Sequence, residues 1–148
     1  MKQEELNKIL ELHRKWLSSE DSTARADLRN ADLRNAYLHG ATLECAILND
    51  ANLRNANLSG ANLFGATLRG ADLEGTILTY AKNIYTFNAY DTSRRMVYCV
   101  KHKDTFMCQA GCFWGTLDEL ETKVKEDHNS KVYLGNIAIM REILKDYE

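Results

Sequence analysis

The chain has 148 residues, of which 27% are charged, and a formal net charge of −2 at pH 7. This balance favours neither nucleic acid nor an acidic partner, so we do not expect nucleic-acid binding. No apolar run approaches the roughly 18–20 residues that cross a bilayer, and the charged start MKQEELNK lacks the apolar core of a signal peptide, so we expect a cytoplasmic protein without membrane contact.

An amphipathic helix is expected first, over residues 4–18 of an N-terminal segment that spans residues 1–21. Charged residues occupy most of its surface, and apolar residues recur at spacings of three and four along one stripe. The stripe comprises Leu6, Ile9, Leu10, His13, Trp16 and Leu17. A helix of this kind must bury its stripe against another part of the protein.

The next segment, residues 22–82, repeats with a period of five. Eleven leucines stand at this spacing from Leu28 to Leu78, and alanine keeps it two residues earlier from Ala26 to Ala71, until Thr76 replaces it. Asp, Asn or Thr mostly precedes each leucine, as in RADLRNADLRN and DANLRNANLSGANLFG. A period of five fits neither a helix, whose apolar face recurs at three and four, nor a strand, whose face recurs at two. The pattern therefore indicates a repeat architecture.

The A-(D/N)-L-x-x pattern resembles the pentapeptide-repeat family. This resemblance implies a right-handed, four-sided β-helix with one pentapeptide on each side, Leu and Ala inward, and the other positions in water. Each coil bonds to the coils beside it, so stability is shared along the stack. The first helix is then expected to cap the first coil, which otherwise exposes open strand edges. A docking helix with Trp16 as its anchor is the alternative.

Four arginines of the repeats form a candidate binding strip. With four repeats per coil, residues twenty apart stack on one side, which brings onto two adjacent sides Arg29, Arg34, Arg54 and Arg69. These arginines interleave with Asp27, Asp32 and Asp72. A solvated face of alternating charge is the favoured interpretation, and a strip that binds a small anionic ligand is the alternative.

Large apolar side chains replace polar ones at five outward positions: Tyr37, Ile47, Phe64, Ile77 and Tyr80. Solvated sides rarely gather such residues, so we expect them to form an interface. The favoured cover is the C-terminal region of the chain. A second copy in a homodimer comes next, and a protein target is the third candidate.

Residues 83–148 depart from the repeat and are expected to form a β-meander followed by a helical hairpin. Strands alternate in IYTFNAY, MVYCVKH and TFMCQAGCFW, with turns at DTSRR and KHKD. Thr116 and Glu119 form a capping box that opens a helix over Leu117–Asp127. A last helix over Lys131–Lys145 is expected to bury Val132, Leu134, Ile137, Ala138, Met140, Ile143 and Leu144. The stretch GCFWGTLDELETKVKEDH is similar to tails of uncharacterised phage and prophage pentapeptide-repeat proteins, which implies no activity.

The tail also carries a candidate metal set, Cys99, His102, Cys108 and Cys112. Four soft ligands suit a tetrahedral zinc ion, but the spacing resembles no zinc module. In one strand Cys108 and Cys112 would point to the same side, as alternating core residues do. We therefore expect buried, reduced thiols and no cofactor, with a structural zinc as the weaker alternative.

Positive charge concentrates in the tail at Arg94, Arg95, Lys101, His102 and Lys103. The favoured interpretation is two charged hairpin turns, and the alternative is a site for a phosphate-bearing ligand.

The expected fold class is mainly β: a quadrilateral β-helix with an N-terminal capping helix and a small C-terminal α+β region. No phosphate loop, dinucleotide fingerprint, HExxH pattern or nucleophile elbow occurs, so we do not expect an enzyme. We expect a rigid scaffold, phage- or bacterium-encoded, that binds and modulates another protein. Sequestration of a signalling nucleotide in phage counter-defence is the alternative. A gyrase-binding DNA mimic is weaker, because the repeats carry five Arg against six Asp or Glu.

Overall fold

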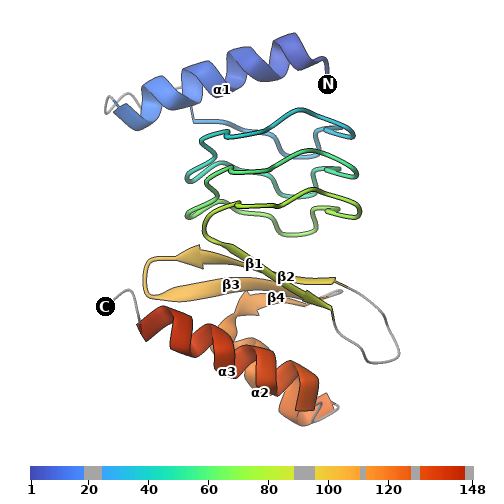
Figure 1. The fold of residues 1–148 in the computed structure, drawn as a ribbon, viewed down its shortest axis with the longest axis vertical. Coiled ribbons are helices and arrows are strands. Elements are labelled where there is room, and N and C mark those ends of the chain that lie inside the picture. The colour runs from blue at the N-terminus through green and yellow to red at the C-terminus, as the bar shows by residue number, and fades with distance from the viewer. Residues whose placement is uncertain (19–24, 89–95, 111–112, 128–130, 146–148) are drawn as a thin grey trace. The chain divides into compact units, whose positions relative to one another are not determined.

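The computed structural model describes residues 1–18, 25–88, 96–110, 113–127 and 131–145. The chain divides into two compact units, Met1–Ile84 and Tyr85–Glu148. The first holds helix α1 and the repeats, and the second holds a sheet and two helices (Figure 1). Within the described ranges no helix has the length and apolar character needed to cross a membrane.

Helix α1 runs over Gln3–Ser18, one residue earlier than the sequence predicts. Its first turn carries Glu4 and Glu5 and its last turn carries Lys15, an order that suits the helix dipole. The predicted stripe faces inward: Leu6 and His13 are buried, and its other members are half-buried. The stripe prediction is therefore confirmed.

The repeats form four-sided coils. Within each pentapeptide, the residue before the leucine bridges in parallel to the residue twenty later, as in Asp27 to Ile47 and Asp32 to Asn52. Ile47 N–H donates to the Ala26 carbonyl at 2.9 Å, and Leu28 N–H donates to the Ile47 carbonyl at 2.8 Å. The same bridge recurs for all four repeats of a coil, so the segment is a quadrilateral β-helix.

The interior of this β-helix is a stack of leucines and alanines. From Leu28 to Leu68 every repeat leucine is at most 1% exposed. Burying one such side chain contributes roughly 1.5–3 kcal/mol, so these leucines supply much of the driving force for folding. The inward assignment of Leu and Ala is confirmed.

Where Asp or Asn precedes the leucine, its side chain closes a local turn. Asp32 Oδ1 accepts the N–H of Arg34 at 3.2 Å, and Asn57 Oδ1 accepts the N–H of Ser59 at 3.0 Å. Asp and Asn suit this position because their side-chain oxygen reaches the backbone two residues on. The preference for Asp or Asn therefore reflects turn geometry rather than charge.

The last residue of each pentapeptide adopts a positive φ, between 57° and 72°. Gly, Asn and Asp, which tolerate this conformation, occupy nine of the eleven positions. The exceptions are Cys45, with φ 59°, and Tyr80, with φ 57°.

The first coil has an open edge, and α1 lies along it (Figure 1). Gln3 Oε1 accepts the N–H of Tyr37 at 3.0 Å, and Gln3 Nε2 donates to the Tyr37 carbonyl at 3.0 Å. His13 Nδ1 accepts the N–H of Ala26 at 3.1 Å. Gln3 thus bonds to backbone groups that a preceding coil would otherwise bond. His13 replaces a bond within the coil, since the alanine N–H of later repeats donates to a leucine carbonyl, as in Ala31 to Leu28 at 3.1 Å.

The second unit is built on a four-stranded sheet of order β1-β2-β3-β4. Its strands are β1 (Ile84–Asn88), β2 (Met96–His102), β3 (Thr105–Ala110) and β4 (Phe113–Thr116). The prediction of one strand over TFMCQAGCFW is wrong. Ala110 and Phe113 are register partners, so the chain reverses between them. Alternation of apolar residues alone cannot separate one long strand from a hairpin.

Helices α2 (Leu117–Asp127) and α3 (Lys131–Lys145) have the predicted bounds. Glu119 Oε2 accepts the Thr116 N–H at 2.7 Å, and Thr116 Oγ1 accepts the Glu119 N–H at 3.2 Å, which confirms the capping box. The helices pack with the sheet around a core of Val97, Cys99, Phe106, Cys108, Leu117, Leu120, Val124, Ile137 and Met140. Ala138 is exposed, contrary to the prediction. The side chains of Val132 and Leu144 lie outside the described part.

Candidate functional site

One side of the β-helix carries no Lys, Arg, Asp or Glu. We call it the uncharged face, and it comprises residues 37–40, 57–60 and 77–80, with the sequences YLHG, NLSG and ILTY. Parallel bridges from Tyr37 to Asn57 and from Asn57 to Ile77 stack these three segments on each other. The leucines point inward, so aromatic, aliphatic, amide and hydroxyl groups remain outside.

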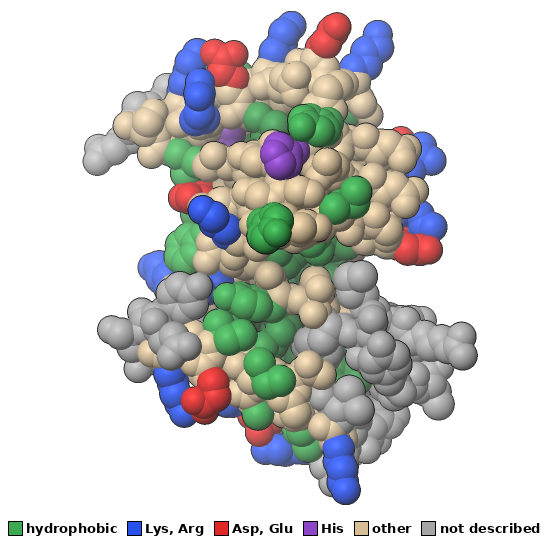
Figure 2. Space-filling view, in the orientation of Figure 1, with side chains coloured by type: hydrophobic (Ala, Val, Ile, Leu, Met, Phe, Trp, Pro, Cys, Tyr) green, Lys and Arg blue, Asp and Glu red, His purple; other side chains and the backbone are tan. Residues whose placement is uncertain are grey.

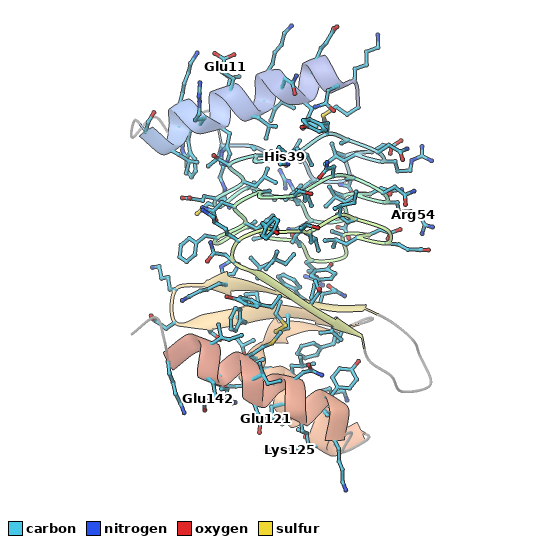
Figure 3. The ribbon with its side chains drawn as sticks, viewed as in Figure 1. Glu11, His39, Arg54, Glu121, Lys125 and Glu142 are labelled. Carbon is cyan, nitrogen blue, oxygen red and sulfur yellow. A yellow bond between two sulfur atoms is a disulfide. The ribbon has the colours of Figure 1, made fainter. Side chains whose placement is uncertain are left out.

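Three large apolar side chains of the uncharged face are exposed to solvent: Tyr37 is 61% exposed, Ile77 48% and Tyr80 87%. The rings of Tyr37 and His39 lie 5.9 Å apart. Figure 2 shows hydrophobic side chains beside a histidine on this side of the repeats, and Figure 3 labels His39 there, with Arg54 at the margin. A gathering of this kind is typical of surfaces that meet a partner.

The other two residues of the predicted interface lie elsewhere. Ile47 stacks between Asp27 and Thr67 on one side of the β-helix. Phe64 lies on another side, two residues after Asn62, which stacks on Thr42. Both side chains are half-buried. The structure thus brings Tyr37, Ile77 and Tyr80 together and leaves Ile47 and Phe64 on different sides.

Tyr80 combines exposure with an unfavourable backbone. Its φ of 57° matches those of Gly40 and Gly60, which precede it in the same ladder at 65° and 68°. A residue with a Cβ atom pays about 1–2 kcal/mol for this conformation. Local strain at an exposed aromatic residue is a reason to look for a binding role.

The arginines of the repeats are mostly paired with acids. Arg29 Nε donates to Asp27 Oδ1 at 2.8 Å, and Arg34 Nε donates to Asp32 Oδ1 at 2.8 Å. These hydrogen bonds hold the pKa of each aspartate below its usual value. These two sides of the β-helix therefore carry alternating positive and negative charge, which is the interpretation favoured from the sequence.

The other two arginines of the candidate strip are Arg54 and Arg69. Arg54 pairs with Asp72 at 3.3 Å and with Glu74 of the next coil. These two acids raise the pKa of the Arg54 guanidinium. For the Arg69 guanidinium the described residues provide no acidic partner.

The basic cluster of the tail is only partly described. Arg94 and Arg95 lie outside the described residues. Lys101 is just 6% exposed. Residues two apart on a strand point to the same face, so Lys101 shares with Val97 and Cys99 the face of β2 that bears the core. His102 is half-buried, and Lys103 is exposed at the β2–β3 turn. A surface cluster that includes Lys101 is therefore not formed.

Cys99 and Cys108 form a disulfide. They stand directly opposite each other in the antiparallel pair of β2 and β3, and both are fully buried. The expectation of reduced thiols is wrong for this pair, because spacing alone does not reveal strand register. Sulfurs bonded to each other cannot bind zinc, and the described residues contain no cluster of metal-ligating side chains. Cys112 lies outside the described residues.

Comparisons with known proteins concern the repeats. A family signature for pentapeptide repeats matches residues 24–60 and 56–82, in eight copies. Residues 24–82 belong to the pentapeptide-repeat family. A solved pentapeptide repeat protein, Rfr23 from the cyanobacterium Cyanothece 51142, is 51% identical over 37% of this chain and 37% of its own length, with a TM-score of 0.37. The match thus spans little more than a third of that protein. Among curated proteins, none matches this chain.

Neither the pentapeptide-repeat signature nor the sequence pattern points to the contacts at the open edge. Gln3 and Asn7 read as ordinary polar residues of a surface helix, although Gln3 bonds to the Tyr37 backbone and Asn7 accepts a hydrogen bond from Gln3. His39 lies on the uncharged face and is absent from the predicted interface. The stacking of residues twenty apart, which places Tyr37 and Ile77 on one side, also places His39 on that side and could have identified it.

Proposed function

We propose that this pentapeptide-repeat protein is a non-enzymatic scaffold that binds another protein on its uncharged face. The observation that carries the proposal is the exposure of Tyr37, Ile77 and Tyr80 on one side that has no charged residue. Tyrosine is enriched among the anchors of protein interfaces, and the buried core of an interface is mostly apolar.

The chemistry of the uncharged face suits a protein surface better than a charged ligand. Asn57, Ser59 and Thr79 place amide and hydroxyl groups among the apolar side chains, where they can bond to backbone groups of a partner. Binding of nucleic acid relies on Lys and Arg contacts to phosphate, which this face does not offer.

The backbone beneath the face is held by regular hydrogen bonds. Leu38 N–H donates to the Asn57 carbonyl at 2.8 Å, and Leu58 N–H donates to the Ile77 carbonyl at 2.9 Å. A surface ordered before binding loses less conformational entropy when the partner arrives. This order favours a fixed docking surface over an adaptable one.

The two alternatives have less support. Sequestration of a phosphate-bearing ligand by the repeat arginines would compete with the acids that already pair with Arg29, Arg34 and Arg54. DNA mimicry requires a long acidic face, and the acidic residues of the repeats alternate with these same arginines.

The test uses substitutions that the repeats themselves contain. Tyr37→Asn and Ile77→Asn copy Asn57, and Tyr80→Gly copies Gly60, so the triple variant is expected to fold. Arg69→Asn on a charged side copies Asn49 and is the matched control. Proteins captured from the native host are compared for the wild type and both variants, and the captured protein is then produced pure and titrated calorimetrically.

We expect the triple variant to lose at least about tenfold in affinity while the control keeps it. Sedimentation velocity of the wild type shows whether the partner is a second copy, in which case the triple variant becomes monomeric. Equal affinity of the wild type and the triple variant for the purified partner would overturn the proposal.

A further inference from the structure

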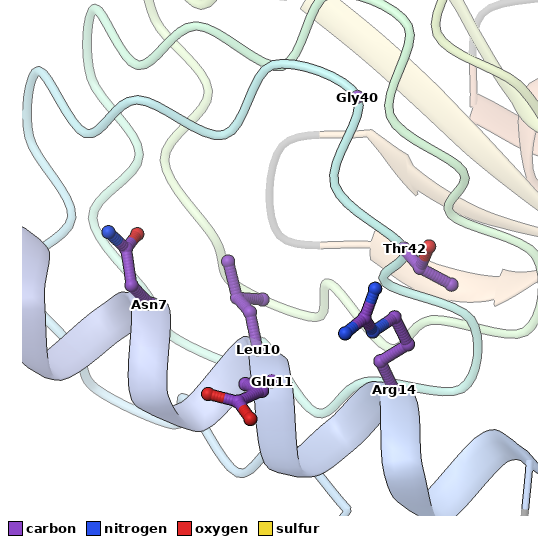
Figure 4. A pocket seen from close by; sticks show the side chains of 6 residues that line it. All are labelled: Asn7, Leu10, Glu11, Arg14, Gly40 and Thr42. Carbon is purple, nitrogen blue, oxygen red and sulfur yellow. The ribbon is translucent and has the colours of Figure 1, made fainter.

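A hollow of about 380 Å³ lies between α1 and the first coil (Figure 4). It borders the uncharged face, to which Gly40 belongs, and is lined by Asn7, Leu10, Glu11, Arg14, Gly40 and Thr42. Its volume falls in the lower range of pockets that hold small molecules. The hydrogen-bond donors and charges of its lining determine which ligand it can hold.

Thr42 contributes a backbone donor to the hollow. In the next coil the equivalent N–H, that of Asn62, points back along the stack and donates to the Ala41 carbonyl at 3.0 Å. Thr42 belongs to the first coil, so its N–H points off the end of the stack, toward α1. Within the ranges that the structure describes, no acceptor bonds to it. Thr42 is half-buried, so this N–H is a backbone donor that a ligand in the hollow can use.

Asn7 contributes a second donor, and hydrogen bonding fixes its orientation. The Tyr37 N–H can only donate, so Gln3 must present Oε1 to it. Gln3 Nε2 then donates to the Tyr37 carbonyl and to Asn7 Oδ1, the latter at 2.8 Å. Because Asn7 Oδ1 is already engaged, the amide NH₂ of Asn7 remains available to a ligand.

Arg14 contributes the positive charge. Figure 4 shows Asn7, Leu10 and Arg14 directed from α1 toward the coil, with Leu10 between the two polar side chains. Glu11, the one acid of the lining, pairs with Lys15 at 2.9 Å. Among the described residues Arg14 forms no ion pair with an acid, although the Glu11 carboxylate interacts with its charge from a greater distance. The hollow therefore has three donors, one of them cationic, around an apolar centre.

We propose that this hollow binds the carboxylate of a small apolar acid, with the carboxylate at Arg14 and Thr42 and the apolar chain on Leu10. A guanidinium pairs with a carboxylate through two parallel hydrogen bonds. One arginine balances a single negative charge, whereas a phosphate dianion beside Glu11 would leave negative charge uncompensated. A carboxylate therefore fits better than a phosphate.

The probe is 4-methylpentanoate, titrated into the ¹⁵N-labelled full chain and followed by NMR. We expect saturable shifts of the Gly40 and Thr42 amides and of the Asn7 side-chain amide. Arg14→Gln should weaken binding by at least about tenfold. Lys8→Gln, a loss of charge at an exposed position of the same helix, is the matched control and should leave binding unchanged.

Two more ligands identify the source of the carboxylate. If an acetylated dipeptide ending in leucine binds and its C-terminal amide does not, the hollow accepts the end of a peptide. If only 4-methylpentanoate binds, it accepts a free acid. The proposal is overturned if neither carboxylate binds, if Arg14→Gln binds as well as the wild type, or if inorganic phosphate binds more tightly than both. The spectrum of Arg14→Gln also reports whether the variant is folded.

Discussion

The side-chain amide of Gln3 takes the place of a backbone peptide opposite Tyr37. Its oxygen accepts the Tyr37 N–H and its nitrogen donates to the Tyr37 carbonyl, both at 3.0 Å. Between coils the corresponding bonds come from the neighbouring strand, as in Asn57 N–H to the Ala36 carbonyl at 2.9 Å. One glutamine thus ends the ladder on this side of the β-helix.

Gln3→Met should lower the free energy of unfolding by about 1 kcal/mol, because it keeps the side-chain length and removes both hydrogen bonds to Tyr37. Urea unfolding followed by circular dichroism measures the change. Lys8→Met makes a comparable substitution at an exposed position of the same helix and should have little effect. Equal losses in both variants would mean that the amide contacts contribute nothing specific.

His13 should make stability depend on pH. Burial lowers its pKa from the usual 6.5, while the nearby Glu44 opposes this change and Arg25 reinforces it. The neutral ring accepts the Ala26 N–H, and protonation would remove that acceptor. The folded state therefore favours the neutral form. Its contribution to stability is present above pH 6.5 and is lost as pH falls through the lowered pKa.

Urea unfolding at pH about 7.5 and about 5.5 tests this dependence, in the range where histidine rather than carboxylate titrates. His13→Asn keeps an acceptor near Ala26 but cannot titrate, so its stability should change less between the two conditions. His39→Asn alters an exposed histidine and should behave as the wild type does. The same pH response in His13→Asn as in the wild type would assign the effect to another group.

Tyr80→Gly should raise stability by about 0.5–1 kcal/mol, because glycine adopts the positive φ of this position without strain but loses more entropy on folding. Thr79→Gly, one residue earlier and without a positive φ, should instead destabilise the protein. Thermal unfolding compares the two variants. If Tyr80 anchors a partner, the more stable variant is also the weaker binder; a loss of stability in Tyr80→Gly would remove the argument from strain.

The disulfide between Cys99 and Cys108 should make the second unit sensitive to reductant. Closing a loop of this length stabilises a folded protein by about 2–3 kcal/mol. Urea unfolding with and without a reductant should show that loss in the wild type. The double variant Cys99→Val with Cys108→Val should not respond, since both sulfurs are absent. An unchanged wild-type midpoint would contradict the disulfide.

Much of the fold could be predicted from the sequence because the determining contacts are periodic. The leucine at every fifth position assigns the interior, and the resemblance to pentapeptide repeats implies four sides per coil and therefore stacking of residues twenty apart. The same ladder placed Tyr37, Ile77 and Tyr80 on one surface. The bounds of α2 and α3 were also readable, since the capping box at Thr116 and the apolar spacing in α3 are local signals.

The sequence by itself determined which residues of each repeat face inward and which face outward, because a repeated local contact leaves a repeated pattern. Only the tertiary structure decided the contacts between segments that share no pattern. Gln3 meets Tyr37, Arg14 lies near Thr42, and Cys99 stands opposite Cys108. Each of these pairs depends on how a helix docks or on which register two strands adopt, and neither property is encoded in the spacing of residues along the chain.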